Sequence, residues 1–190
     1  MEYGLPKSVE IGGTKFEIRY DFRVILEIFE ALNDPEMTER ERAYVVLQMF
    51  YVDFESISDY NAALKELFRF TNRGELEDSA KRPPKLVSWE QDFQYIVAPI
   101  NKVLGCETRA IEYDIESNTG GVHWWTFLAG YMEIGDCFFA QVVRIRDKKA
   151  KGKKLDKSEQ EFYRKNRDLV DIKTKYSDAE NDLLKAWTGG

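Results

Sequence analysis

The residues of this chain that could take part in catalysis are few and far apart. His123 is the only histidine, and neither Cys106 nor Cys137 has a second thiol nearby. Because a structural zinc site needs four nitrogen or sulfur ligands, this set favours a structural role for His123. A nucleophile pair of Cys137 with His123 would have to meet across a helix break, without oxyanion donors. The sequence therefore predicts neither zinc chemistry nor nucleophilic catalysis.

A short row of carboxylates is the second candidate. Glu112, Asp114 and Glu116 alternate as in an extended segment and could place their carboxylates on one side, as a two-metal nuclease requires. No histidine or lysine accompanies them, so the pattern favours an ordinary acidic surface loop over 107–119. The pair Gly12-Gly13 lacks the spacing of a phosphate-binding loop and predicts a turn. We expect a protein that is not an enzyme and that holds no cofactor and no metal.

Charge is distributed unevenly along the chain. The formal net charge is −6, yet the tract 144–167 contains 11 basic and 4 acidic residues. Phe162 and Tyr163 lie within this tract, and interleaved basic and aromatic residues are found in nucleic-acid interfaces. The acidic balance of the remaining chain and the lack of a recognition-helix motif favour a solvated or protein-binding face instead.

Five lysines of this tract surround Gly152, a residue that interrupts helical periodicity. They cannot all lie on one helix face, so we expect most of them to stay hydrated and to speed the capture of an acidic partner. These candidate protein-binding residues are Lys148, Lys149, Lys151, Lys153 and Lys154.

The elements that must position these residues are mainly α-helical. Alternating apolar and polar residues on both sides of Gly12-Gly13 predict a short N-terminal β-hairpin over 9–18. About seven helices follow, with capping boxes expected at Thr38 with Glu41 and at Ser88 with Gln91, and with Asp136 as an N-cap. The last two helices are expected over about 157–168 and 178–187.

The domain organisation follows from the polar, proline-containing stretch in the middle of the chain. We predict a single domain over 1–190, with a possible N-terminal subunit 1–74 that holds the hairpin and three helices. A linker over 75–87 then leads to a helical part over 88–190. No apolar run approaches the roughly 20 residues of a membrane span, and the N-terminus lacks the features of a signal peptide, so we expect a cytoplasmic protein without membrane contact.

One helix of the second half has an unusually wide apolar face. Trp124, Trp125 and Leu128 belong to a face of about 160°, wider than the stripe of about 100° on an ordinary surface helix. Either this helix is central, or part of the face meets another chain. These three residues are therefore candidate protein-binding residues, and a homo-oligomer is possible.

The order of these features resembles a known family. The hairpin 9–18 is followed by Tyr20-Asp21-Phe22-Arg23, Trp89-Glu90-Gln91-Asp92-Phe93 and His123-Trp124-Trp125-Thr126-Phe127. The run Lys151-Gly152-Lys153-Lys154-Leu155 comes next, before Glu159-Gln160-Glu161-Phe162-Tyr163-Arg164. Over nearly its whole length the chain is similar to the gene-product-fifteen family of tailed bacteriophages and prophages of Gram-positive hosts.

This resemblance implies a gene in the phage tail module and a function in tail assembly. It implies a tail assembly chaperone that binds the tape-measure protein and the tail-tube protein, acts in the host bacterial cytoplasm and is absent from the mature virion. The resemblance assigns no catalytic residues to this chain. Two alternatives remain: a nucleic-acid-binding accessory protein that uses the basic tract 144–167, and a structural tail component retained in the virion.

Overall fold

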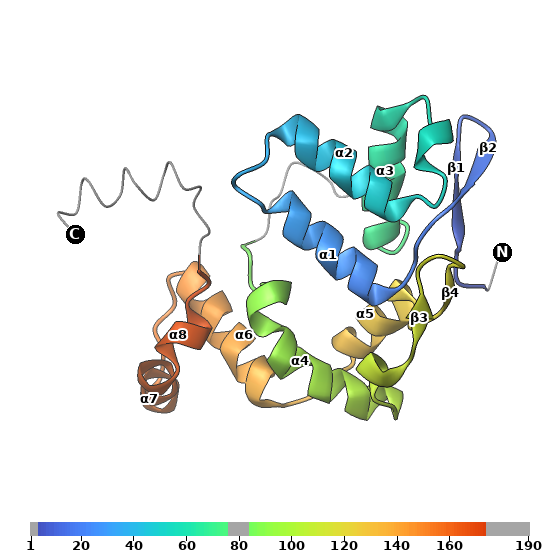
Figure 1. The fold of residues 1–190 in the computed structure, drawn as a ribbon. Coiled ribbons are helices and arrows are strands. Elements are labelled where there is room, and N and C mark those ends of the chain that lie inside the picture. The colour runs from blue at the N-terminus through green and yellow to red at the C-terminus, as the bar shows by residue number, and fades with distance from the viewer. Residues whose placement is uncertain (1–3, 76–83, 174–190) are drawn as a thin grey trace. The chain divides into compact units, whose positions relative to one another are not determined.

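A computed structural model describes residues 4–75 and 84–173 of the chain (Figure 1). The described residues form two compact units: 4–75 with 113–119, and 84–112 with 120–173. We call them the N-terminal unit and the helical unit. The predicted helix 178–187 and most of the predicted linker 75–87 lie outside the described residues. The single domain 1–190, with its possible subunit 1–74 and helical part 88–190, stays a prediction.

The N-terminal unit combines two small hairpins with three α-helices (Figure 1). Its elements are β1 (Ser8–Ile11), β2 (Thr14–Glu17), α1 (Phe22–Leu32), α2 (Glu39–Phe50), the 3-10 helix η1 (Phe54–Ser56), α3 (Tyr60–Thr71) and the short strands β3 (Tyr113–Asp114) and β4 (Thr119–Gly120). Strands β1 and β2 are antiparallel, with Ile11 paired to Thr14. The turn places Gly12 at φ 57° and Gly13 at φ 83°, where side chains with a Cβ are strained. The predicted hairpin is confirmed.

Local side-chain caps begin the helices of this unit. Thr38 and Glu41 form the predicted capping box, in which the Thr38 hydroxyl accepts from the Glu41 N–H and the Glu41 carboxylate accepts from the Thr38 N–H. Asp21, fully buried, caps α1 by accepting from the Arg23 N–H at 3.0 Å. The core that these helices enclose includes Ile18, Ile25, Ile28, Val46, Leu47, Phe50 and Leu67.

Helix α3 turns Ala63, Leu67 and Phe70 inward, which leaves Tyr60 45% and Phe68 42% exposed. One expectation for this unit is wrong. The segment 113–119, expected as an irregular loop, forms a second hairpin. Asn118 holds it in place: its side-chain amide donates to the Glu17 carboxylate at 2.8 Å and to the Ile18 carbonyl at 3.0 Å.

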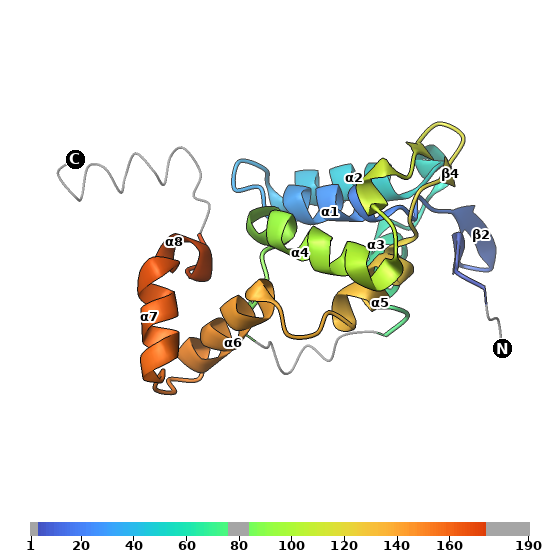
Figure 2. The same ribbon diagram turned by 90° about the horizontal axis from the view of Figure 1, so that it is seen from below.

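The helical unit contains the remaining helices (Figure 2). They are α4 (Trp89–Leu104), the 3-10 helix η2 (Thr108–Ala110), α5 (Trp124–Met132), α6 (Phe138–Ala150), α7 (Lys157–Lys165) and α8 (Arg167–Val170). Helices α4 and α5 approach closely at Gly130, where an added Cβ would lie 3.2 Å from Ile100 and Leu104 side-chain carbons. The predicted helix 157–168 is divided at Asn166, which ends α7 and precedes α8.

Two predicted caps of the helical unit do not form. Ser88 precedes α4 without a side-chain cap; its N–H donates to Asp92 at 2.8 Å, and Gln91 binds elsewhere. Asp136 was expected to cap α6, but the cap is Cys137, whose Sγ accepts from the Ala140 N–H at 3.4 Å. The Gln91 side chain binds the backbone of residues 169 and 173, and Asp136 forms an ion pair with Arg144 at 3.1 Å.

The predicted fold class, mainly α with a short N-terminal β-hairpin, is confirmed. Across residues 4–75 and 84–173, no helix is long and apolar enough to cross a membrane.

Candidate protein-binding surface

Helix α5 divides its apolar residues between the core and the surface. His123 begins the helix, and its Nδ1 accepts from the Trp125 N–H at 3.0 Å. Trp124 is only 1% exposed and packs against Trp89 and Phe127, with ring centroids 5.7 and 6.1 Å away. The wide face predicted from the sequence is therefore partly a core face.

A second row on α5 reaches the surface. Trp125, Leu128 and Met132 follow the i, i+3, i+7 spacing of one helix face. Trp125 and Leu128 are half-buried, and Met132 is 62% exposed. We call these three residues the α5 stripe. Of the predicted tryptophan and leucine candidates, Trp125 and Leu128 lie on the α5 stripe and Trp124 lies beneath it.

The predicted lysines do not behave alike. Lys148 donates to both carboxylate oxygens of Glu159, at 2.5 and 2.7 Å. Lys149 donates to Asp171 and, at 2.8 Å, to the Tyr163 hydroxyl. Lys151 pairs with Asp147 on the preceding turn at 2.7 Å. We expected most of these lysines to stay hydrated, and Lys149 and Lys151 are exposed although each has an acidic partner. Lys148 is half-buried, because α7 folds back against α6.

Lys153 and Lys154 form the remaining part of the predicted basic site. Both lie in the exposed loop after α6 and have no ion pair in the described part of the chain. They are therefore the two predicted lysines whose charge is available to an acidic partner.

The difference between the lysines predicts different effects on stability. Because Glu159 also completes the capping box of α7 with Asp156, Lys148→Gln should lower the free energy of unfolding by about 1 kcal/mol. The double variant Lys153→Gln/Lys154→Gln should change it by less than about 0.5 kcal/mol. Chemical denaturation followed by circular dichroism measures both, and a larger loss in the double variant than in Lys148→Gln would contradict the assignment.

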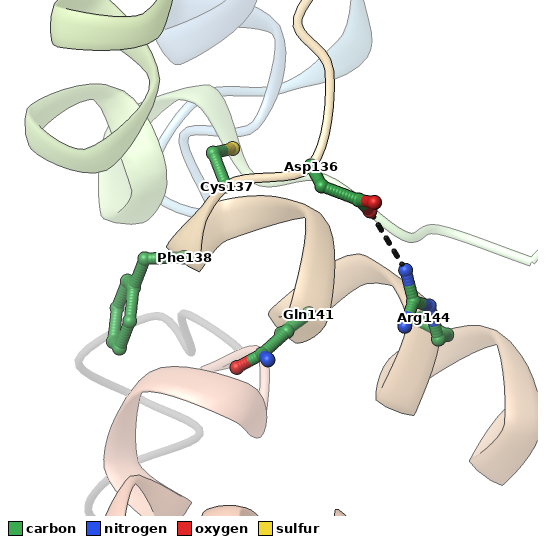
Figure 3. A pocket seen from close by; sticks show the side chains of 5 residues that line it. All are labelled: Asp136, Cys137, Phe138, Gln141 and Arg144. Atoms are coloured by element: carbon green, nitrogen blue, oxygen red, sulfur yellow. Dashed lines mark hydrogen bonds and ion pairs between the residues drawn. The ribbon is translucent and has the colours of Figure 1, made fainter.

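A shallow pocket of about 380 Å³ opens at the start of α6 (Figure 3). It is lined by Asp136, Cys137, Phe138, Gln141 and Arg144. Arg144 spans one side with an ion pair of 3.1 Å to Asp136, and Phe138, 45% exposed, forms an apolar side.

The carboxylate row has a structural role at Asp114. Its side chain accepts from the Glu116 and Ser117 backbone N–H groups and from the Ser117 hydroxyl, and these hydrogen bonds lower the pKa of Asp114. Among the residues that the structure describes, no three His, Cys, Asp or Glu side chains are grouped so that they could hold a metal ion.

A comparison with known families identifies the chain. A model of the family described as Bacteriophage Gp15 protein matches residues 1–172. The chain belongs to the bacteriophage Gp15 family. The resemblance drawn from the sequence motifs is thereby confirmed. No curated protein and no solved structure matches the chain.

The structure brings together residues of this Gp15-family chain that the sequence analysis did not single out. The pocket at α6 was missed because Asp136 was interpreted as a cap. A polar cluster of the buried Asp92 and Arg146 with the half-buried Gln91 was also missed, although an arginine and an aspartate on apolar helix faces were visible in the sequence. Nothing in the local spacing shows that the two charges, 54 residues apart, meet.

Proposed function

We propose that this phage protein is a tail assembly chaperone, which binds the tape-measure protein and assists tail-tube assembly in the host cytoplasm. Membership of the Gp15 family supports a phage-related function. The observation that carries the finer proposal is the α5 stripe. The spacing of its three residues matches the ridge that one helix presents to another in helix packing. The proposed partner, a tape-measure protein, is a very long helical chain with an apolar stripe that such a ridge could contact.

Each contact in this proposal is small and repeated. Three partly exposed apolar side chains bury only a modest area, so one copy binds weakly and can be displaced when tail-tube protein encloses the tape measure. Many copies along one tape measure would cover an apolar stripe that otherwise aggregates. Lys153 and Lys154 would add electrostatic attraction wherever the partner is acidic.

Met132→Asp tests the α5 stripe. The variant places a charge on the most exposed stripe residue, and we expect it to weaken binding to tape-measure fragments at least tenfold, since about 1.4 kcal/mol of apolar contact is lost. Binding is measured by isothermal titration calorimetry with helical fragments that tile the tape-measure protein.

Val103→Asp is the matched control. Val103 is 43% exposed and lies in the last turn of α4, as Met132 lies in the last turn of α5. The control should bind as the unchanged protein does. If the unchanged protein, Met132→Asp and Val103→Asp bind with equal affinity, the α5 stripe is not the binding surface.

The basic tract 144–167 supports the nucleic-acid alternative less than its composition suggested, because Lys148, Lys149 and Lys151 each have an acidic partner. Salt dependence separates the two functions. A nucleic-acid complex weakens steeply with salt through counterion release, whereas binding through the α5 stripe depends on salt only weakly.

A further inference from the structure

An exposed group of aromatic rings lies on the N-terminal unit, where α2 and α3 pack side by side (Figure 1). Phe54, in the connection between the two helices, is only 7% exposed. The Tyr44 ring of α2 meets the Phe54 ring edge to face, with centroids 5.0 Å apart, and the Tyr60 ring of α3 stacks on it at 5.3 Å. We call these three residues the aromatic patch.

Both tyrosines of the aromatic patch reach the surface. Tyr44 is 50% exposed, and Tyr60 is 45% exposed although Phe54 covers one face of its ring. Contact with the buried Phe54 restricts the positions of both rings before any partner arrives. A partner that lies on them therefore costs little further side-chain entropy, which favours binding at this surface.

Carboxylates lie beside the aromatic patch. Asp53 and Glu55 flank Phe54 in the chain, and both are exposed because the side chain between them points into the core. Within residues 4–75 and 84–173, neither carboxylate forms an ion pair. Asp59, also exposed, precedes Tyr60. Exposed rings and negative charge thus occur together on this surface.

The charge near the aromatic patch is mainly negative. Residues 43–64 contain three acidic residues and no lysine or arginine. Arg40, one turn before Tyr44 on α2, offsets only part of this charge. Exposed rings can stack on nucleic-acid bases, but carboxylates repel the phosphates that such a ligand carries. The combination of rings and carboxylates favours a ligand with positive charge.

The chain itself contains the contact that this surface offers to a partner. Lys149 lies over the Tyr163 ring, with its Nζ 3.9 Å from the centroid. It also donates to the Asp171 carboxylate, which accepts from the Tyr163 hydroxyl at 2.8 Å. A cation in this position is attracted both by the face of the ring and by the carboxylate. Among the described residues, no lysine or arginine lies over Tyr44 or Tyr60 in this way.

We propose that the aromatic patch binds a basic segment of a partner protein, with a lysine or arginine side chain over a tyrosine ring and its charge facing Asp53 and Glu55. The contact area is small and the carboxylates are exposed, so a single segment binds weakly and its affinity falls as salt rises. The proposal concerns residues of the N-terminal unit and is independent of the α5 stripe.

A short fluorescent peptide of alternating arginine and glycine tests this binding by anisotropy, with the full chain at low salt. Its counterpart with citrulline in place of arginine has nearly the same shape but no charge. The arginine peptide should bind at least about fivefold more tightly than the citrulline peptide. Equal binding of the two peptides would show that the surface does not select a cation and would overturn the proposal.

Two double variants locate the binding site. Tyr44→Ser/Tyr60→Ser removes the exposed rings, and Asp53→Asn/Glu55→Gln removes the charges and leaves every core residue unchanged. Each double variant should weaken binding of the arginine peptide by about fivefold or more. Circular dichroism checks that both keep the fold, and the charge variant tests the site even if loss of the rings disturbs Phe54. Unchanged affinity in the charge variant would contradict the proposal.

Each double variant has a matched control. Glu133→Gln/Asp168→Asn removes one exposed glutamate and one exposed aspartate from the helical unit. Phe68→Ser removes an aromatic ring that is 42% exposed, about two turns beyond Tyr60 on α3. Both controls should bind the arginine peptide as the unchanged chain does. If the control carboxylates matter as much as Asp53 and Glu55, the peptide follows the net charge of the protein and the proposal is wrong.

Two further measurements test other occupants of the aromatic patch. Binding of a labelled single-stranded oligonucleotide that Tyr44→Ser/Tyr60→Ser abolishes would assign the rings to bases. Self-association in light scattering that the same variant abolishes would assign them to a second copy of the chain. Either result would overturn the proposal, and we expect neither.

Discussion

Replacing Arg146 with methionine is expected to lower the free energy of unfolding of the helical unit by about 3–5 kcal/mol. Methionine keeps much of the side-chain volume but leaves the Asp92 carboxylate buried without its positive partner. It also leaves the carbonyls of Leu86, Leu169 and Val170 without their donor, and each unsatisfied buried group adds to the loss. Denaturant unfolding followed by tryptophan fluorescence measures the change, because Trp89, Trp124 and Trp125 lie in the helical unit.

Arg144→Met is the matched control for this prediction. Arg144 lies on the same helix and also pairs with an aspartate, but Arg144 is 56% exposed and Asp136 is 94% exposed. An exposed pair of this kind contributes less than about 1 kcal/mol. If Arg146→Met and Arg144→Met destabilise the protein equally, the buried cluster does not stabilise the fold as the structure implies.

Trp124→Ala is expected to have an effect of similar size, about 3–5 kcal/mol, because it removes a large side chain from a packed core. Trp124 is 1% exposed and its ring contacts those of Trp89 and Phe127, so truncation leaves a cavity that the aromatic neighbours fill incompletely. Trp125→Ala, on the half-buried side of the helix, should lower the stability less than Trp124→Ala does and should lower the affinity for the partner more. Thermal unfolding and fragment binding, measured on both variants, separate the two roles.

The sequence-based prediction placed Trp124 among the protein-binding residues, and this pair of variants tests that assignment. A Trp124→Ala protein that keeps its melting temperature while losing its partner would show that Trp124 contacts the partner. We expect the reverse, with Trp124→Ala unfolding at a much lower temperature than Trp125→Ala.

Features that depend on neighbouring residues were predictable from the sequence. The Gly12-Gly13 turn requires two positive φ angles, and glycine pairs between alternating strands indicate this directly. The Thr38–Glu41 capping box needs only a hydroxyl and a carboxylate three residues apart on an amphipathic helix. Each is formed by contacts among a few neighbouring residues.

Features that depend on distant residues were not predictable in this way. Ser88 and Gln91 have the spacing of a capping box, but the carbonyls of residues 168–171 occupy the Gln91 amide and Asp92 accepts from the Ser88 N–H. The acidic segment 113–119 was expected as a loop although its carboxylates alternate, because the hairpin is held by Asn118 binding Glu17, which lies 101 residues earlier. Such contacts follow from the tertiary structure and not from local periodicity.

The candidate surface was predictable in part for the same reason. Helical spacing located the apolar residues of α5 but could not show which of them faces the core, since adjacent tryptophans lie about 100° apart on the helix. Lysine composition located the basic tract, but only the return of α7 and α8 to α6 shows that Lys148 and Lys149 are paired while Lys153 and Lys154 remain available.

The solubility of the tape-measure protein tests the proposed chaperone function most directly. The tape-measure gene from the same phage or prophage would be expressed in bacteria alone, with this chain, and with the Met132→Asp variant, and soluble tape-measure protein would be quantified after centrifugation. The proposal predicts aggregation without this chain, a largely soluble complex with it, and an intermediate result with the variant. A tape-measure protein that is equally insoluble in all three cultures would contradict the proposed function.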